Sequence, residues 1–139
     1  MATATIRPPC YRVRHPYLGE PYPDGIWPDK VHVNPSWLWL LCDDVGTVKM
    51  ALLAAPVHGL VFIVRLWSAE DAPKFLLRRL LRSFASECLD RGFKAGMTFL
   101  SVDQPKEVKL AKLALRYGAT GIGFTGFCYG GGLDKLWKH

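Results

Sequence analysis

The sequence predicts an α/β (α+β) domain, and three observations carry the prediction. Residues 72–118 read as an amphipathic stretch, a short apolar run and a second amphipathic stretch, the pattern of helix, strand and helix. Short runs rich in β-branched and aromatic residues lie before and after this unit. Half of the 139 residues are hydrophobic and 22% are charged, as expected of one folded domain. We expect two main helices and about six or seven strands.

The N-terminal part of the chain predicts one short strand followed by an irregular arm. Residues 2–7 alternate threonine with apolar residues, as a strand does. Seven of the ten prolines then fall within residues 8–35, and such a density excludes a regular helix there. The arm also carries Tyr11, Tyr17, Tyr22 and Trp27, which need a surface to lie against. Within a single domain 1–139, we therefore expect arm 8–35 to wrap over its own domain or reach a neighbouring subunit.

Three strands are predicted between the arm and the first helix. Residues 36–42 and 47–55 are β-forming runs separated by a turn sequence, Asp43 to Gly46, and so predict a hairpin. A second turn is expected at Pro56, His58 and Gly59. Residues 60–66, LVFIVRL, form the most strongly β-forming run of the chain. We expect a central strand there, buried on both faces.

The first helix is predicted from the three- and four-residue spacing of its apolar residues. Pro73 suits the first helical turn, and Gly92 marks the end. The opposite side carries Lys74, Arg78 and Arg82. The residues expected on the buried side are Phe75, Leu76, Leu80, Phe84, Cys88 and Leu89.

The C-terminal half predicts a strand, a helix and one or two further strands. Residues 97–102, MTFLSV, indicate a buried strand, and a second helix is expected from Pro105 to Gly118. Residues 120–128 alternate small residues with large apolar ones and predict one more strand. The glycines at 130–132 are expected to form a flexible turn before a final strand at 133–137.

Charge and composition limit the classes of partner. The net charge of +6 makes an acidic partner such as nucleic acid plausible, because Lys109, Lys112 and Arg116 form a second basic stripe beside that of the first helix. A solvated basic face is the simpler interpretation. Nothing in the N-terminus resembles a signal peptide, and no apolar run is long enough to cross a bilayer. We expect no secretion and no membrane span.

No metal or nucleophile site is predicted. The four cysteines are far apart and form no CxxC pair, so they are expected to be reduced and mostly buried, with Cys88 in the core. The histidines, among them His15, lack the spacing of metal ligands and are expected in loops or on the surface. Asp43 and Asp44 suit a hairpin turn better than a pair of catalytic carboxylates. Trp37 and Trp39 are expected on one strand face.

The order of elements resembles the Gcn5-related N-acetyltransferase (GNAT) fold. The resemblance is carried by the strand LVFIVRL, by the strand MTFLSVD that follows the first helix, and by KLALRYGAT at residues 112–120, which is similar to the end of the family's second helix. It covers roughly half of the chain. It implies a mixed, mainly antiparallel sheet.

Two departures from the family pattern stand at functional positions. The family's loop R/Q-x-x-G-x-G/A brings main-chain N–H groups close to the coenzyme A pyrophosphate, and its glycines fall on Phe75 and Leu77. The family's general-acid tyrosine falls on Ala114, which has no proton to give, while Tyr117 lies on another side of the helix. The resemblance therefore implies a degenerate site with no confident catalytic residue and no cofactor.

The pattern is most similar to the small GNAT-like virion proteins of short-tailed bacteriophages. The leading hypothesis is a virion-associated structural or accessory protein that contacts other virion proteins or itself, in the virion or the host cytoplasm. The first alternative is an active N-acetyltransferase that uses acetyl-coenzyme A. The second alternative is a basic nucleic-acid-binding or regulatory module. If acetyl-coenzyme A binds, the resemblance implies these residues: Val64, Arg65, Leu66, Trp67, Lys74, Phe75, Leu76, Leu77, Arg78 and Arg79.

Overall fold

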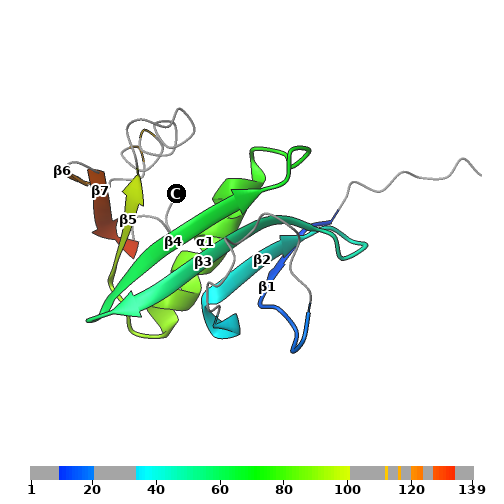
Figure 1. Ribbon diagram of the computed structural model, residues 1–139, viewed down its shortest axis with the longest axis horizontal. Helices are drawn as coiled ribbons and strands as arrows, with labels where there is room; N and C mark the ends of the chain where they lie inside the picture. The colour runs from blue at the N-terminus through cyan, green and yellow to red at the C-terminus, as the bar shows by residue number, and fades with distance from the viewer. Residues whose placement is uncertain are drawn as a thin grey trace, which may run out of the picture.

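The computed structural model is built around one twisted sheet with a long helix across one face (Figure 1). It describes residues 10–20, 34–100, 112, 116, 120–123 and 127–133, with the backbone alone for 99–100, 120–123 and 127–132. The strand order is β1-β2-β3-β4-β5-β7-β6. All neighbouring strands are antiparallel except β4 and β5. A mixed, mainly antiparallel α+β sheet was the class predicted.

The predicted hairpin is confirmed as β2 (Leu38–Cys42) and β3 (Val48–Val57). Its turn is held by the Asp43 carboxylate, which accepts hydrogen bonds from the main-chain N–H groups of Val45 and Thr47. Gly46 has a φ of 87°, which explains the glycine at this position. Before β2, residues Pro35–Trp37 form a short 3₁₀ turn, so Trp37 precedes the strand that holds Trp39.

The Pro-rich arm is not wholly irregular. Residues Arg12–Arg14 form β1, an edge strand that pairs with β2, and Arg14 forms a bidentate ion pair with Glu20 in the following turn. The part of the arm at residues 10–20 therefore lies against its own domain, which was one of the two arrangements expected for the arm. Edge strands tolerate nearby proline, which explains why a short edge strand forms within this Pro-rich part of the chain. Residues 2–7 and the rest of the arm at 21–33 lie outside the described residues.

Strand β4 (Leu60–Ser68) is central in the order, but the prediction that it is buried on both faces is wrong. Only Val61 is fully buried, and Val64 and Arg65 are exposed. The turn before it comprises His58 and Gly59, both with positive φ, so Pro56 lies within β3 and not in the turn. The strand buried along its whole length is β2.

Helix α1 (Leu76–Asp90) connects β4 to the parallel strand β5 (Ala95–Leu100). The helix begins later than predicted, because Pro73 to Phe75 form turns before it. It ends at Asp90, and Gly92, whose φ is 94°, follows the C-cap residue Arg91. Leu76, Leu80, Phe84 and Cys88 are buried as predicted, and Leu89 packs against the same core. Phe75 is not on the buried side, because 71% of it is exposed.

The single strand predicted at 120–128 is two strands, β6 (Thr120–Gly123) and β7 (Phe127–Gly132), which pair antiparallel. The glycines 130–132 lie in β7 opposite β5 and do not form a turn. Close packing explains glycine in this region, since a Cβ on Gly96 of β5 would lie 3.2 Å from the Leu133 side chain. The predicted strand at 133–137 is wrong at Leu133, which is buried and helical, and otherwise lies outside the described residues.

The core lies on both faces of the sheet. On the α1 side, Trp39 and Leu52 pack with Leu80 and Phe84. On the other side, Leu38, Leu40 and Leu53 form a second cluster with Trp67 at its margin. The second predicted helix lies outside the described residues except for Lys112 and Arg116, which are helical and exposed. No helix of the described residues is long and apolar enough to cross a membrane.

Candidate functional site

The first feature of the site is the point where β4 and β5 separate. Their parallel pairing runs from Leu60 and Ala95 to Ile63 and Thr98, and Figure 1 shows the two strands diverging beyond it. The Thr98 hydroxyl donates to the Ile63 carbonyl at 3.3 Å, at the last paired position. No described strand pairs with β4 on this side after Ile63. One edge of Val64 to Trp67 is thus left without a strand neighbour in the described part of the chain.

A β-bulge falls at the same point. On its other side β4 pairs with β3, where Ile63 lies opposite Ala54 and Arg65 lies opposite Leu53, so Val64 is the extra residue. A bulge bends its strand and leaves one residue outside the hydrogen-bond ladder. Here the bulge falls where the pairing of β4 with β5 ends, and 57% of Val64 is exposed.

Of the four β4 residues predicted to bind a cofactor, two use their side chains for packing. Leu66 packs against the cluster under α1, and Trp67 packs against the cluster on the opposite face. Consecutive residues of a strand point to opposite faces, so this is the normal alternation. It leaves the main chain of this segment as the group with which β4 could bind an extended ligand, in the manner of an added strand.

The second feature is the N-terminus of α1, where the family pattern would place phosphate. The N–H of Leu76 donates to the Pro73 carbonyl at 3.1 Å, and the N–H of Leu77 donates to the Lys74 carbonyl at 3.3 Å. A helix N-terminus binds anions through N–H groups that lack an intrahelical partner. At this helix, two of the first N–H groups are bonded to the preceding turns, and Pro73 has none to offer.

The side chains at the start of α1 point in different directions. The Phe75 ring is largely exposed, Leu76 is buried at 1% exposure, and Leu77 packs against the core. Lys74 is exposed. Just before them, Asp71 forms an ion pair with Lys49 at 2.8 Å, which lowers the pKa of its carboxyl group. Leu76 and Leu77 therefore cannot turn their side chains to a ligand without leaving the core.

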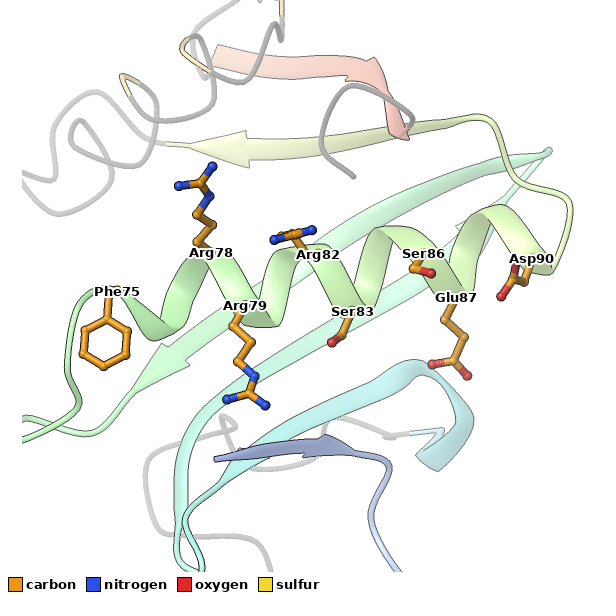
Figure 2. A pocket seen from close by; sticks show the side chains of 8 residues that line it. All are labelled: Phe75, Arg78, Arg79, Arg82, Ser83, Ser86, Glu87 and Asp90. Atoms are coloured by element: carbon orange, nitrogen blue, oxygen red, sulfur yellow. The ribbon is translucent and has the colours of Figure 1, made fainter. Parts of the chain in front are cut away.

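A groove of about 620 Å³ runs along the outer face of α1, and Figure 2 shows the residues that line it. Phe75, Arg78 and Arg79 are the predicted cofactor residues that the structure brings together there. The predicted residues of β4 do not line this groove, so it is a separate surface from the β4 edge. Eight described residues line the groove: Phe75, Arg78, Arg79, Arg82, Ser83, Ser86, Glu87 and Asp90.

Other candidate positions carry no active-site chemistry in the described residues. Asp43 is a turn residue, as predicted. Cys42 and Cys88 are buried, and burial raises the pKa of the Cys88 thiol to about 12, which suppresses the nucleophilic thiolate. The described residues hold no group of three or more potential metal ligands. Ala114 and Tyr117 lie outside the described residues.

A polar cluster links the N-terminal arm to the C-terminal half of α1, and the sequence did not predict it. The Glu87 carboxylate accepts hydrogen bonds from His15 Nε2, from Trp39 Nε1 and from the Arg91 guanidinium, each at 2.7 Å. His15 Nδ1 lies 2.8 Å from the Leu38 carbonyl oxygen. Both ring nitrogens therefore lie within hydrogen-bond distance of an oxygen atom. His15 lies in the loop that follows β1, as expected, and its ring also bridges the arm to α1.

Aromatic rings surround this cluster. The rings of His15 and Trp39 have centroids 5.0 Å apart, Trp39 packs edge-on against Phe84 at 5.0 Å, and the Arg91 guanidinium lies 4.7 Å from the Trp37 ring. Burial opposes ionisation of Glu87, but the hydrogen bonds from His15, Trp39 and Arg91 outweigh it and lower the pKa of its carboxyl group. The cluster fixes the arm to the core.

Local sequence could not reveal the partners in this cluster. His15 and Glu87 are 72 positions apart, so no spacing rule connects them. Two indirect signals were available. The aromatic residues of the arm need a surface to lie against, and Glu87 and Arg91 are spaced as an ion pair on one helix.

Comparison with known proteins identifies the fold. No protein-family model and no curated protein sequence matches the chain. Among solved structures, a putative acyl-CoA N-acyltransferase from Klebsiella pneumoniae has a TM-score of 0.66 at 12% identity, over 88% of this chain and 97% of that one. Ard1 from Thermoplasma volcanium has a TM-score of 0.64 at 12% identity, with the same coverage of both chains.

A third solved structure is the ribosomal-protein-S18-alanine N-acetyltransferase from Escherichia coli, with a TM-score of 0.62 at 10% identity, over 89% of this chain and 94% of that one. Other neighbours are also described as acetyltransferases of the GNAT family. At such low identity the likeness extends to the fold alone. The chain has the GNAT acetyltransferase fold, as the resemblance in the sequence implied.

Proposed function

We propose that this GNAT-fold protein has a degenerate acyl-coenzyme A site and acts as an interaction protein. The observation that carries the proposal is the N-terminus of α1, where Pro73 and Lys74 accept the N–H groups of Leu76 and Leu77. A pyrophosphate needs such N–H groups and close access to the backbone. The exposed Phe75 ring stands at the same turn. The residues here do not fit a pyrophosphate.

The alternative is an active N-acetyltransferase, and one observation favours it. The bulge at Val64 and the divergence after Ile63 leave an edge of β4 without a described strand neighbour. An acyl-pantetheine chain carries amides that could bond to such an edge. Arg79 could add long-range attraction for phosphates, although a positive charge does not replace missing N–H groups. The structural neighbours named as acetyltransferases support this alternative through the fold only.

The virion role is the finer part of the proposal, and its support is the resemblance of residues 75–91, 99–102 and 116–119 to GNAT-like phage proteins. The second alternative, binding of nucleic acid, is supported by exposed basic residues on helical segments, among them Arg79, Lys112 and Arg116. Binding of this kind weakens steeply as salt concentration rises. A salt titration of duplex and single-stranded DNA binding separates it from the leading proposal.

The test is a calorimetric titration of the protein with acetyl-coenzyme A. We expect no binding at micromolar affinity, which corresponds to about −8 kcal/mol. The matched variant is Phe75→Gly, because Phe75 is exposed while Leu77 packs in the core and should be left intact. Binding gained in this variant would identify the ring as one obstacle. Micromolar binding by the unmodified protein would overturn the proposal and support the acetyltransferase.

A further inference from the structure

The charges on the outer face of α1 are arranged against the helix dipole. Arg78 and Arg79 lie in its first turn, which contains no acidic residue, and Asp90 lies in its last turn, which contains no basic one. A helix by itself is stabilised by the reverse arrangement, with acidic residues first and basic residues last. This arrangement of charges does not stabilise the helix by itself. Opposite charges from outside the helix would stabilise it.

Two of these charges have no partner within the described part of the chain. Arg79 and Asp90 are exposed, line the same groove, and form no hydrogen bond or ion pair with described residues. Between them on the helix lie Ser83 and Ser86, two small residues. Figure 2 shows this outer face with the sheet behind the helix. Along the line of these four residues the groove has a basic end, two serines and an acidic end, and Arg82 and Glu87 also line it near the serines.

The four residues also have a symmetric spacing. Arg79, Ser83, Ser86 and Asp90 are separated by steps of four, three and four positions, which is the spacing of a helix–helix seam. The sequence of steps is the same in both directions. A two-fold axis midway between Ser83 and Ser86 would therefore place Arg79 of each copy opposite Asp90 of the other.

We propose that this face of α1 is a self-association surface, on which two copies of the chain pack their α1 helices antiparallel. The occupant of the groove is then a second copy, chosen by charge complementarity: each end of the helix meets the opposite charge and the opposite end of a helix dipole. The serines at the centre allow the helices to approach closely. The proposal deepens the interaction role above by naming a partner, and its geometry does not depend on coenzyme binding.

A second pair has the same symmetry but contributes less. Arg82 and Glu87 are also equidistant from the axis, so they would face each other across the interface. Glu87 already accepts hydrogen bonds from three internal donors, so its carboxylate is less available to a partner helix. Phe75 extends the groove beyond Arg79, and its exposed ring would be covered at the margin of the dimer.

The expected dimer is weak and sensitive to salt. A helix of 15 residues is about 22 Å long, so one helix pair gives an interface at the lower end of the specific range. Exposed ion pairs are screened at high ionic strength. We expect a reversible monomer–dimer equilibrium that shifts toward monomer as salt is added.

The test is sedimentation equilibrium with two charge reversals, Arg79→Asp and Asp90→Arg. Each variant alone brings like charges together at both ends of the seam, so we expect its dimerisation to weaken at least about tenfold. In an equimolar mixture, aspartates of the first variant face arginines of the second, and we expect a heterodimer to form. Arg12→Asp changes an exposed charge on β1 and is the control for net charge.

Three results would overturn the proposal. They are an unmodified protein that stays monomeric up to about 1 mM, single variants that dimerise as well as the unmodified protein, and a mixture that does not regain the dimer. Circular dichroism of each variant shows whether it is folded, so misfolding is not mistaken for lost association. The coenzyme titration measures ligand binding and sedimentation measures association of the chain, so the two proposals fail separately.

Discussion

The edge of β4 and the N-terminus of α1 differ in how much main chain they leave available. At β4, a bulge at Val64 and the loss of β5 as a neighbour after Ile63 leave one edge without a described partner. At α1, the turns at Pro73 and Lys74 take up two of the first N–H groups. Main chain that is left without a partner on one element can therefore lie close in sequence to main chain whose N–H groups local turns have already bonded.

The largest expected effect contrasts two phenylalanines at the same helix. Phe84 is fully buried against Trp39, whereas 71% of Phe75 is exposed. Phe84→Ala should therefore destabilise the protein by about 3–5 kcal/mol. Phe75→Ala should change the free energy of unfolding by less than about 0.5 kcal/mol. Urea unfolding measures both, and equal losses would contradict the placement of Phe75 outside the core.

A smaller effect is expected at Glu87. Glu87→Gln removes the charge that three donors share and sets an amide N–H₂ against one of them, so we expect a loss of about 2 kcal/mol at neutral pH. Asp90→Asn is the matched control on the same helix, with an expected change within about 0.5 kcal/mol. Thermal unfolding at low protein concentration measures both variants. A Glu87→Gln protein as stable as the control would exclude the cluster as the link between arm and core.

The same variant should also flatten the pH dependence of stability. The folded-state pKa of Glu87 lies below its usual 4.5, because hydrogen bonds to the carboxylate outweigh the effect of burial. A depressed pKa means that the stabilisation is complete above about pH 4.5 and is lost as the pH falls through the folded-state value. Denaturation curves between pH 3 and 6 should show this loss in the unmodified protein and a smaller one in Glu87→Gln. Parallel curves would contradict it.

The next prediction changes the β4 side of the comparison. Deletion of Val64 removes the extra residue while the pairs on either side of it, Ile63 with Ala54 and Arg65 with Leu53, can remain. We expect a change in stability within about 1 kcal/mol, because a residue outside the ladder is lost. Without the bend, β4 can follow β5 further. Amide hydrogen exchange at residues 65–67 should then slow, and unchanged exchange would show that the bulge does not keep this edge open.

The sequence predicts features that depend on residues close together in the chain better than features that depend on residues far apart in it. The hairpin at Asp43–Gly46 follows from turn chemistry and was predicted correctly. Helical spacing predicted the burial of Leu76, Leu80, Phe84 and Cys88 but did not include Leu81 and Ala85, which are also buried. The resemblance also gave the fold. The exposure of Phe75 was missed because the helix begins one residue after it. Helix boundaries are set by turns such as that at Pro73, which periodicity does not locate.

The remaining errors concern long-range packing. The glycines of β7 resembled a flexible turn, but they lie opposite β5, and this pairing leaves no trace in the local sequence. The bulge at Val64 exposes part of a strand whose composition indicates burial. His15 and Glu87 meet across 72 positions. Such features depend on register and tertiary contact, which a single sequence does not specify.

The proposed function requires that the N-terminus of α1 adds nothing to the binding of phosphates. The most direct measurement compares the affinities of acetyl-pantetheine, which lacks the pyrophosphate, and acetyl-coenzyme A, with amide chemical shifts of residues 64–67 and 75–77 as the readout. We predict weak binding of both, at equal affinity within about threefold, with shifts confined to β4. Acetyl-coenzyme A bound at least about tenfold more tightly, with shifts at residues 75–77, would contradict the account.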